Sequence, residues 1–174
     1  EQRAQAMEAL VRTGAGFWTM PHGEPEWVKI PAGAGWMGSV RGRPNERPLH
    51  QVELDAFLIA RVPITNAQYH LFVQAERHPA PQHWQEGHPP KGLASHPVTY
   101  VSWHDALAYC LWLSRQTSKQ IALPSEAQWE KAARSNDEQW EYPWGDRFEA
   151  TWCNSEALGL GTTTPVGIFP EGAS

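Results

Sequence analysis

The sequence predicts an α+β domain with short strands, two or three helices and much irregular structure. Its 174 residues include 14 glycines and 15 prolines, which interrupt most apolar stretches before they become long. Short segments of alternating polarity and separate segments of helical period occur along the same chain. Ten tryptophans argue against a disordered chain, because large rings of this kind usually fill a core or a contact surface. Together these observations favour one loop-rich globular domain of the α+β class.

Two segments have the alternating pattern of strands. Residues 27–33 (WVKIPAG) predict a short strand that ends at Pro31. Residues 51–64 (QVELDAFLIARVPI) alternate apolar and polar positions, and they predict strands interrupted by a turn at Asp55.

A glycine pattern follows the first of these strands. Gly33, Gly35 and Gly38 spell GxGxxG, the spacing of many dinucleotide-binding loops. That motif works only where a helix begins, because the helix N-terminal N–H groups face the pyrophosphate. Residues 39–44 end in Pro44 and cannot continue as a helix. A glycine-rich turn is therefore favoured over a nucleotide site.

Four segments have helical period: residues 1–13, 65–75, 102–113 and 125–134. The first is expected to be a lead-in helix. The other three begin at candidate N-cap residues, which are Thr65, Ser102 and Ser125. Two of these caps have a capping-box partner three residues later, Asp105 for Ser102 and Gln128 for Ser125. Four aromatic residues of the last two segments are expected to be buried: Trp103, Tyr109, Trp112 and Trp129.

A long loop over residues 76–98 contains five prolines and four histidines. The histidines, His78, His83, His88 and His96, raise the possibility of zinc. Structural zinc sites prefer ligands two to four residues apart or one helical turn apart, and these spacings are wider. A solvated polar loop is favoured over a metal site.

Two further groups resemble catalytic sets. Ser102, His104 and Asp105 are the residue types of a nucleophile triad, but neighbours on one helical turn point in different directions. Capping accounts for Ser102 and Asp105. Glu126 and Glu130 lie one turn apart, where negative charge suits the N-terminal half of a helix. The sequence therefore assigns no catalytic and no cofactor-binding residue.

The charge and composition exclude some classes of partner. The formal net charge is −5, which argues against non-specific binding to nucleic acid or to an anionic membrane. No apolar stretch is long enough for a transmembrane helix.

The chain has two cysteines, Cys110 and Cys153. They could form a disulfide with each other, pair with a partner outside this chain, or stay as buried thiols. No secretory pattern is present and the first residue is not Met, so the compartment stays open with a slight preference for the cytoplasm.

Several blocks occur in an order that resembles the formylglycine-generating enzyme (sulfatase-modifying factor) family. They are WVKIPAG with the nearby MGS at 37–39, then residues 46–69, 96–113, 123–134 and 142–146, Cys153-Asn154, and TTPVG at 163–167. The resemblance implies a variant of the C-type lectin-like fold. It predicts a lead-in helix and linker over residues 1–26 and a family domain over 27–174 that is incomplete at its C-terminus.

The resemblance also implies possible cofactors. Enzymes of the family oxidise a sulfatase cysteine with O₂ and a copper ion held by two late cysteines, and neither Cys110 nor Cys153 matches that pair. Cys110 matches a position that often forms a disulfide in the family. Copper is therefore expected only if a C-terminal part supplies the pair. The resemblance further predicts calcium at Asn154 and Ser155, although the loop beyond keeps one carboxylate, Glu156; an Asn that satisfies turn backbone groups is the alternative.

Two functions follow from the resemblance. The first is a ligand- or protein-binding module, such as a variable protein diversified by a retroelement or a module appended to a signalling protein. It would be completed by a companion C-terminal fragment and would bind a protein or peptide. The alternative is a copper-dependent oxidase whose catalytic cysteines lie outside this chain. A third use in the family, an iron-dependent sulfoxide synthase, needs an N-terminal histidine-bearing domain that this sequence does not show.

Overall fold

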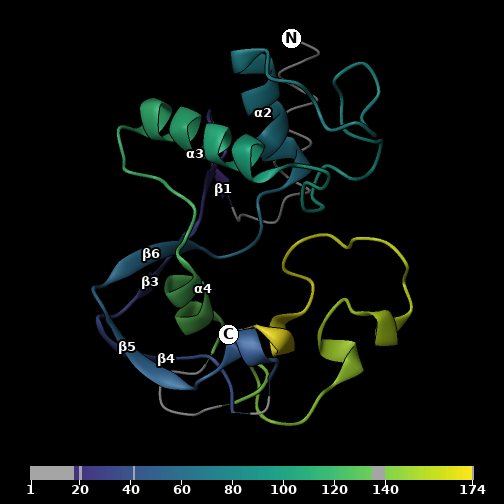
Figure 1. Cartoon of the computed structure of the whole chain (residues 1–174). Helices are drawn as coiled ribbons and strands as arrows, with labels where there is room; N and C mark the ends of the chain where they lie inside the picture. The colour runs from purple at the N-terminus through teal and green to yellow at the C-terminus, as the bar shows by residue number, and fades with distance from the viewer. Residues whose placement is uncertain (1–17, 20, 41, 135–139, 174) are drawn as a thin grey trace. The chain divides into compact units, whose positions relative to one another are not determined.

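The computed structural model describes residues 18–19, 21–40, 42–134 and 140–173, and the chain forms two compact units (Figure 1). Unit 1 consists of the chain up to Trp27, Ala60–Leu123 and Thr162–Ile168. Unit 2 consists of Val28–Ile59, Pro124–Gly161 and Phe169–Ser174. The lead-in helix expected over 1–13 lies outside the described residues. None of the helices in the described ranges combines the length and the apolar character that crossing a membrane requires.

Unit 1 is built around two helices. Its elements are β1 (Trp18–Thr19), β2 (Glu24–Pro25), α2 (Asn66–Glu76) and α3 (Trp103–Thr117). The two strands pair antiparallel, and α2 packs against α3 (Figure 1). Both helices begin at the expected caps, where the hydroxyl of Thr65 accepts from the N–H of Gln68 and that of Ser102 accepts from the N–H of Asp105. Local capping therefore determines where both helices start.

Aromatic side chains from both helices and from the following loop form the core of unit 1. They meet at ring-centroid distances of 5.3 Å for Tyr69–Phe72, 5.7 Å for Tyr69–Tyr109 and 5.6 Å for Tyr109–Trp112. The expected burial of Tyr109 and Trp112 is confirmed, since they are 4% and 2% exposed. The expectation for Trp103 is wrong: it lies in the first turn of α3, away from this cluster, and is 62% exposed.

Unit 2 contains four short strands and one helix. They are β3 (Trp27–Ile30), β4 (Gly33–Met37), β5 (His50–Leu54), β6 (Phe57–Ala60) and α4 (Glu126–Ala133). β3 pairs with β6, and β4 pairs antiparallel with β5 so that Gly35 lies opposite Val52. Four short 3₁₀ turns complete the unit: η1 (Pro44–Glu46), η2 (Ala150–Trp152), η3 (Glu156–Leu158) and η4 (Pro170–Gly172). The strands on either side of Asp55 and the start of α4 after Ser125 agree with the sequence predictions.

A buried lysine of α4 contacts the backbone at the start of β4, the strand against which this helix packs. Lys131 is 4% exposed, and its Nζ donates to the carbonyl oxygens of Pro31 at 3.0 Å and Gly33 at 2.7 Å. Its methylenes lie over Gly35, where a Cβ would come within about 3.0 Å of them. Gly35 therefore allows the lysine stem to approach the strand, which is a packing role for part of the GxGxxG pattern.

Two further side chains of α4 hold the turn after β4. The backbone N–H of Gly38 donates to Glu130 Oε1 at 3.0 Å, and Arg134 donates to the Gly38 carbonyl at 2.9 Å. Gly38 has φ +85°, which favours glycine, and β4 ends here without a helix. The interpretation as a turn is correct for Gly38, whereas Gly33 and Gly35 belong to strand β4, where they pair with β5. Glu130 was expected only to suit the helix dipole, but it also accepts this hydrogen bond from the turn. Trp129 was expected to be buried, and this expectation is wrong, since it is 62% exposed.

Candidate ligand-binding site

A tight turn places the aromatic residues of the YPWGD block in unit 2. Tyr142 and Gly145 exchange two backbone hydrogen bonds of 3.0 and 3.1 Å. Gly145 has φ +130°, a conformation that L residues rarely adopt, so the turn depends on glycine at this position. The carboxylate of Asp146 accepts from the backbone N–H of Glu141 at 3.2 Å and closes the segment.

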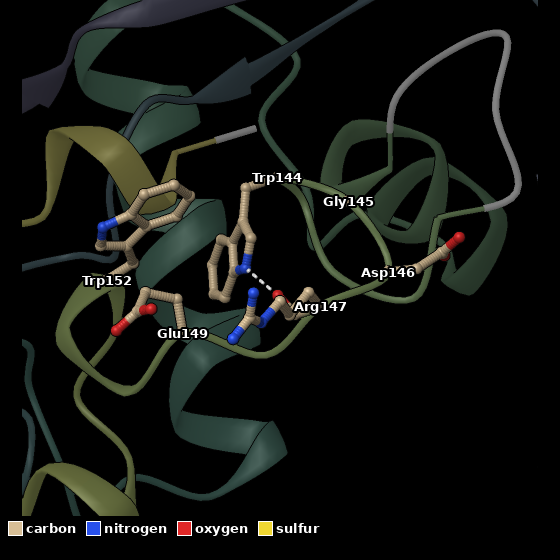
Figure 2. Close-up of a pocket in the computed structure, with 6 residues that line it drawn as sticks. All are labelled: Trp144, Gly145, Asp146, Arg147, Glu149 and Trp152. Carbon is tan, nitrogen blue, oxygen red and sulfur yellow. Dashed lines mark hydrogen bonds between the residues drawn. The ribbon is translucent and has the colours of Figure 1, made fainter.

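Three rings pack around this turn. Trp144 stacks on Tyr142 with centroids 5.5 Å apart and an angle of 11° between the planes. Trp152, from η2, meets Trp144 edge to face at 5.8 Å and 79°. The Nε1–H of Trp144 donates to the carbonyl oxygen of Arg147 at 3.0 Å (Figure 2). The two indoles are thus held in place, with their ring surfaces only partly covered.

A pocket of about 320 Å³ opens between these indoles and the chain that connects them (Figure 2). It is lined by Trp144, Gly145, Asp146, Arg147, Glu149 and Trp152. The charged side chains are exposed, whereas both tryptophans are half-buried. Glu149 Oε1 accepts from the hydroxyl of Thr151 at 2.9 Å, which orients its carboxylate at the start of η2. The pocket therefore combines apolar ring surface with charged groups of both signs, as ligand sites do.

The predicted calcium residues follow directly after this pocket. Asn154 is exposed, and the Oγ of Ser155 is buried with no hydrogen-bond partner in the structure. A calcium ion takes six to eight oxygen ligands, and the nearest carboxylate in the sequence, Glu156, is exposed. Across the described ranges, no group of three or more His, Cys, Asp or Glu side chains is placed to hold a metal ion. Calcium at Asn154 and Ser155 stays a prediction.

The triad-like residues do not form a catalytic set. The Ser102 hydroxyl donates to Asp105 Oδ2 at 2.6 Å, and Asp105 Oδ1 lies 2.8 Å from the Nε2 of His78. The hydroxyl is thus paired with the carboxylate, whereas a nucleophile needs a histidine base. The hydrogen bonds from Ser102, and then the one from His78, lower the pKa of Asp105 to about 2.

The histidines of the 76–98 loop each have a different neighbour. His78 reaches Asp105, His96 Nδ1 lies 2.9 Å from the Thr163 hydroxyl, His83 packs on Tyr100, and His88 packs on His70. The four do not converge, so a zinc site made from them is not formed.

The two cysteines belong to different units. Cys110 is buried in α3 of unit 1, Cys153 follows η2 in unit 2, and both are free thiols. Burial raises the pKa of the Cys110 thiol, which disfavours the thiolate needed to bind copper. The cysteines present therefore do not fit a copper site.

Sequence reasoning missed the charged residues of the pocket. No sequence pattern singled out Arg147 or Glu149, and Trp144 and Trp152 fell only under the general expectation that tryptophans fill a core or a contact surface. Their common signal was local: charged side chains between aromatic residues in a turn-rich segment. The pocket itself depends on the turn at Gly145, which brings Trp144 against Trp152.

Residues 17–173 match the model of the sulfatase-modifying factor enzyme 1-like domain family. A formylglycine-generating enzyme of Mycobacterium tuberculosis (strain ATCC 25618 / H37Rv) is 32% identical over 208 residues, with 83% of this chain and 67% of that protein covered. An inactive C-alpha-formylglycine-generating enzyme 2 of Mus musculus is 30% identical, with 84% and 63% covered. The alignment runs over 208 positions, which is more than the 174 residues of this chain. Within the aligned region the mycobacterial relative therefore has inserted stretches.

The fold also resembles a solved structure. That of PvdO from Pseudomonas aeruginosa superposes with a TM-score of 0.66 at 27% identity, over 84% of this chain and 63% of PvdO. The chain thus spans about two thirds of the length of each of these three proteins.

Proposed function

The chain belongs to the sulfatase-modifying factor enzyme 1-like domain family, and we propose that it is a ligand-binding module that binds a protein or peptide at the Trp144–Trp152 pocket. The observation that supports this proposal is the pocket itself, which is lined by two indole surfaces and by the charged groups of Arg147 and Glu149. A volume of about 320 Å³ accommodates one or two amino-acid side chains rather than a large cofactor.

The chemistry of the pocket suits a peptide. An apolar ligand side chain would lie against the indole surfaces of Trp144 and Trp152. Binding would remove its apolar surface from water, which favours the complex. Arg147 donates hydrogen bonds and Glu149 accepts them, so together they match the C=O and N–H groups of a peptide backbone. The Glu149 carboxylate is already oriented by Thr151, which lowers the entropy cost of binding.

The composition of unit 2 supports a protein partner. Its buried positions within the described ranges are Gly35 and Lys131, so no large apolar side chain is fully covered there. Five of its large hydrophobic residues are exposed: Val40, Leu58, Trp129, Phe148 and Leu160. Exposed apolar surface is typical of interaction sites. We assign part of this surface to a C-terminal companion segment, in keeping with the greater length of the relatives.

Peptide selection followed by point variants tests the proposal. A random peptide library would be selected on the immobilised 174-residue chain, and the enriched peptide would be synthesised and titrated by calorimetry. We expect Trp152→Ala and Glu149→Gln each to weaken its binding by about tenfold or more. The control is Trp103→Ala, which removes a side chain of the same size that is 62% exposed in unit 1, and this variant should bind as the wild type does. Equal affinity for Trp152→Ala and wild type, or no enrichment, would reject the pocket as the site.

A copper-dependent oxidase is the second candidate, because a formylglycine-generating enzyme is 32% identical over most of the chain. That activity would need two cysteines supplied by another segment. Incubation of the chain together with a C-terminal segment that carries such a cysteine pair, with Cu⁺, O₂ and a cysteine-bearing sulfatase peptide, followed by mass spectrometry, distinguishes the two functions. We expect no formylglycine, and its formation would favour the oxidase.

A further inference from the structure

We propose that His70 and His88 form an open two-histidine site for a divalent transition-metal ion in unit 1. Their rings lie 5.0 Å apart between centroids, with an angle of 47° between the planes. A zinc or copper ion binds an imidazole nitrogen at about 2.0–2.1 Å, which places the ring centroid about 3.2 Å from the metal. Two such ligands at a tetrahedral angle have centroids about 5 Å apart, so the observed spacing fits one shared ion.

One nitrogen of His70 has no partner within the protein. Its Nδ1 is buried and forms no hydrogen bond in the structure. In a neutral imidazole whose proton is on the other nitrogen, such an atom offers a lone pair that a metal ion can accept.

The backbone holds His88 opposite His70. The N–H of His88 donates to the carbonyl of Gln85 at 2.9 Å, and the two residues between them have positive φ, 51° at Glu86 and 76° at Gly87. This is the geometry of a type I′ turn, which is well defined.

Trp84 fixes the position of this turn against α2. It is 7% exposed, and its ring lies 5.7 Å from that of His70 and 6.2 Å from that of Tyr69. The two histidines are therefore placed by a packed tryptophan and a defined turn, which favours binding without rearrangement.

The site is open on the side of His88, which is exposed. Among the residues that the structure places, no third His, Cys or carboxylate joins the pair. Water would fill the remaining coordination positions. Imidazole ligands select Cu²⁺ and Zn²⁺ over Mg²⁺, and Cu²⁺ should bind more tightly than Zn²⁺.

Calorimetric titration of the full 174-residue chain with Zn²⁺, Cu²⁺ and Mg²⁺ separately tests the site. We expect one equivalent of Zn²⁺ and of Cu²⁺ to bind, with no binding of Mg²⁺. His88→Ala should weaken Zn²⁺ binding by about tenfold or more. His83→Ala is the matched control, because it removes an exposed histidine of the same loop that packs on Tyr100 instead. It should bind as the wild type does, and so should Cys153→Ser.

A long-range ¹⁵N spectrum of the histidine rings provides a second readout that does not require a His70 variant to fold. Zn²⁺ should shift the Nδ1 resonance of His70 and one nitrogen of His88, while the rings of His78 and His96 stay unchanged. The proposal is overturned if wild type binds no Zn²⁺ or Cu²⁺. It is equally overturned if His83→Ala weakens binding as much as His88→Ala, which would indicate binding spread over surface histidines.

Discussion

The two units of this chain are stabilised in different ways. All ten buried hydrophobic side chains among the described residues belong to unit 1, where aromatic rings from α2, α3 and the 76–98 loop meet. In unit 2 the buried residues of the described ranges are Gly35 and Lys131, which contact each other. Unit 1 therefore relies on apolar burial, while unit 2 relies on hydrogen bonds from α4 to the backbone around β4.

This difference explains why the candidate peptide site lies in unit 2. An interior without large buried side chains leaves aromatic residues available at the surface, and Trp144, Trp152 and Phe148 remain partly or largely exposed. In unit 1 the corresponding rings are used to pack the two helices. A metal site there depends on that packing, because Trp84 places the turn that carries His88.

The largest expected effect contrasts one tryptophan from each unit. Trp112→Ala removes a ring that is 2% exposed, and it should lower the free energy of unfolding by about 3–5 kcal/mol. Trp129→Ala removes a ring of unit 2 that is 62% exposed, and it should cost about 0.5 kcal/mol or less. Urea unfolding followed by circular dichroism measures both. Equal destabilisation would mean that the two units do not differ as described.

A second prediction concerns the lysine that takes the place of a core residue in unit 2. Lys131→Met keeps the apolar stem but removes the donors to Pro31 and Gly33, so unfolding should become easier by about 1–3 kcal/mol. Lys91→Met, at an exposed position of unit 1, is the control and should have little effect. Amide exchange of α4 and β4 would locate the loss. A neutral or stabilising Lys131→Met would show that apolar contact alone suffices there.

The same capping motif occurs in both units, which allows a direct comparison. Thr65 is fully buried, and its partner Gln68 also donates to the carbonyl of Gly23 at 2.8 Å; Ser125 is exposed. Thr65→Ala should therefore cost about 2 kcal/mol, and Ser125→Ala about 0.5–1 kcal/mol. Denaturant midpoints of the two variants test this order. The reverse order would mean that burial does not strengthen the cap.

The smallest effect is the pH dependence of the α3 cap in unit 1. The pKa of Asp105 is about 2 in the folded chain, below its usual value of 3.8, so its contribution to stability is present above about pH 4. That contribution disappears as the pH falls through 2. In Asp105→Asn the free energy of unfolding should therefore decrease less between pH 4 and pH 2 than in wild type.

Asp55→Asn is the control for this pH series, because it removes an exposed carboxylate from the β5–β6 turn of unit 2. It should keep the slope of the wild type. An unchanged slope in Asp105→Asn would contradict the role assigned to the Ser102–Asp105 pair.

Local features of the fold were predictable because their causes lie within a few residues. The starts of α2, α3 and α4 follow from the caps at Thr65, Ser102 and Ser125, each of which bonds to a residue three positions later. The break at Asp55 and the proline-rich loop follow from equally local rules.

Burial could not be predicted in the same way. Trp103 and Trp112 belong to one helix and have the same side chain, yet they are 62% and 2% exposed, because only Trp112 lies on the face that meets α2. The sequence pattern of α4 likewise did not indicate that Lys131 would be buried. Its burial requires the carbonyls of Pro31 and Gly33, about 100 residues earlier in the chain, to lie beside it.

The sequence by itself determined the α+β class, the family and the helix starts, since these depend on residue types, order and near neighbours. The tertiary structure decided which tryptophans became core and which line the pocket. It also placed the ring of His88 beside that of His70, which lies in helix α2 and not among the histidines of the 76–98 loop. The physical reason is that burial and pairing depend on contacts between segments far apart in the chain, which no local spacing encodes.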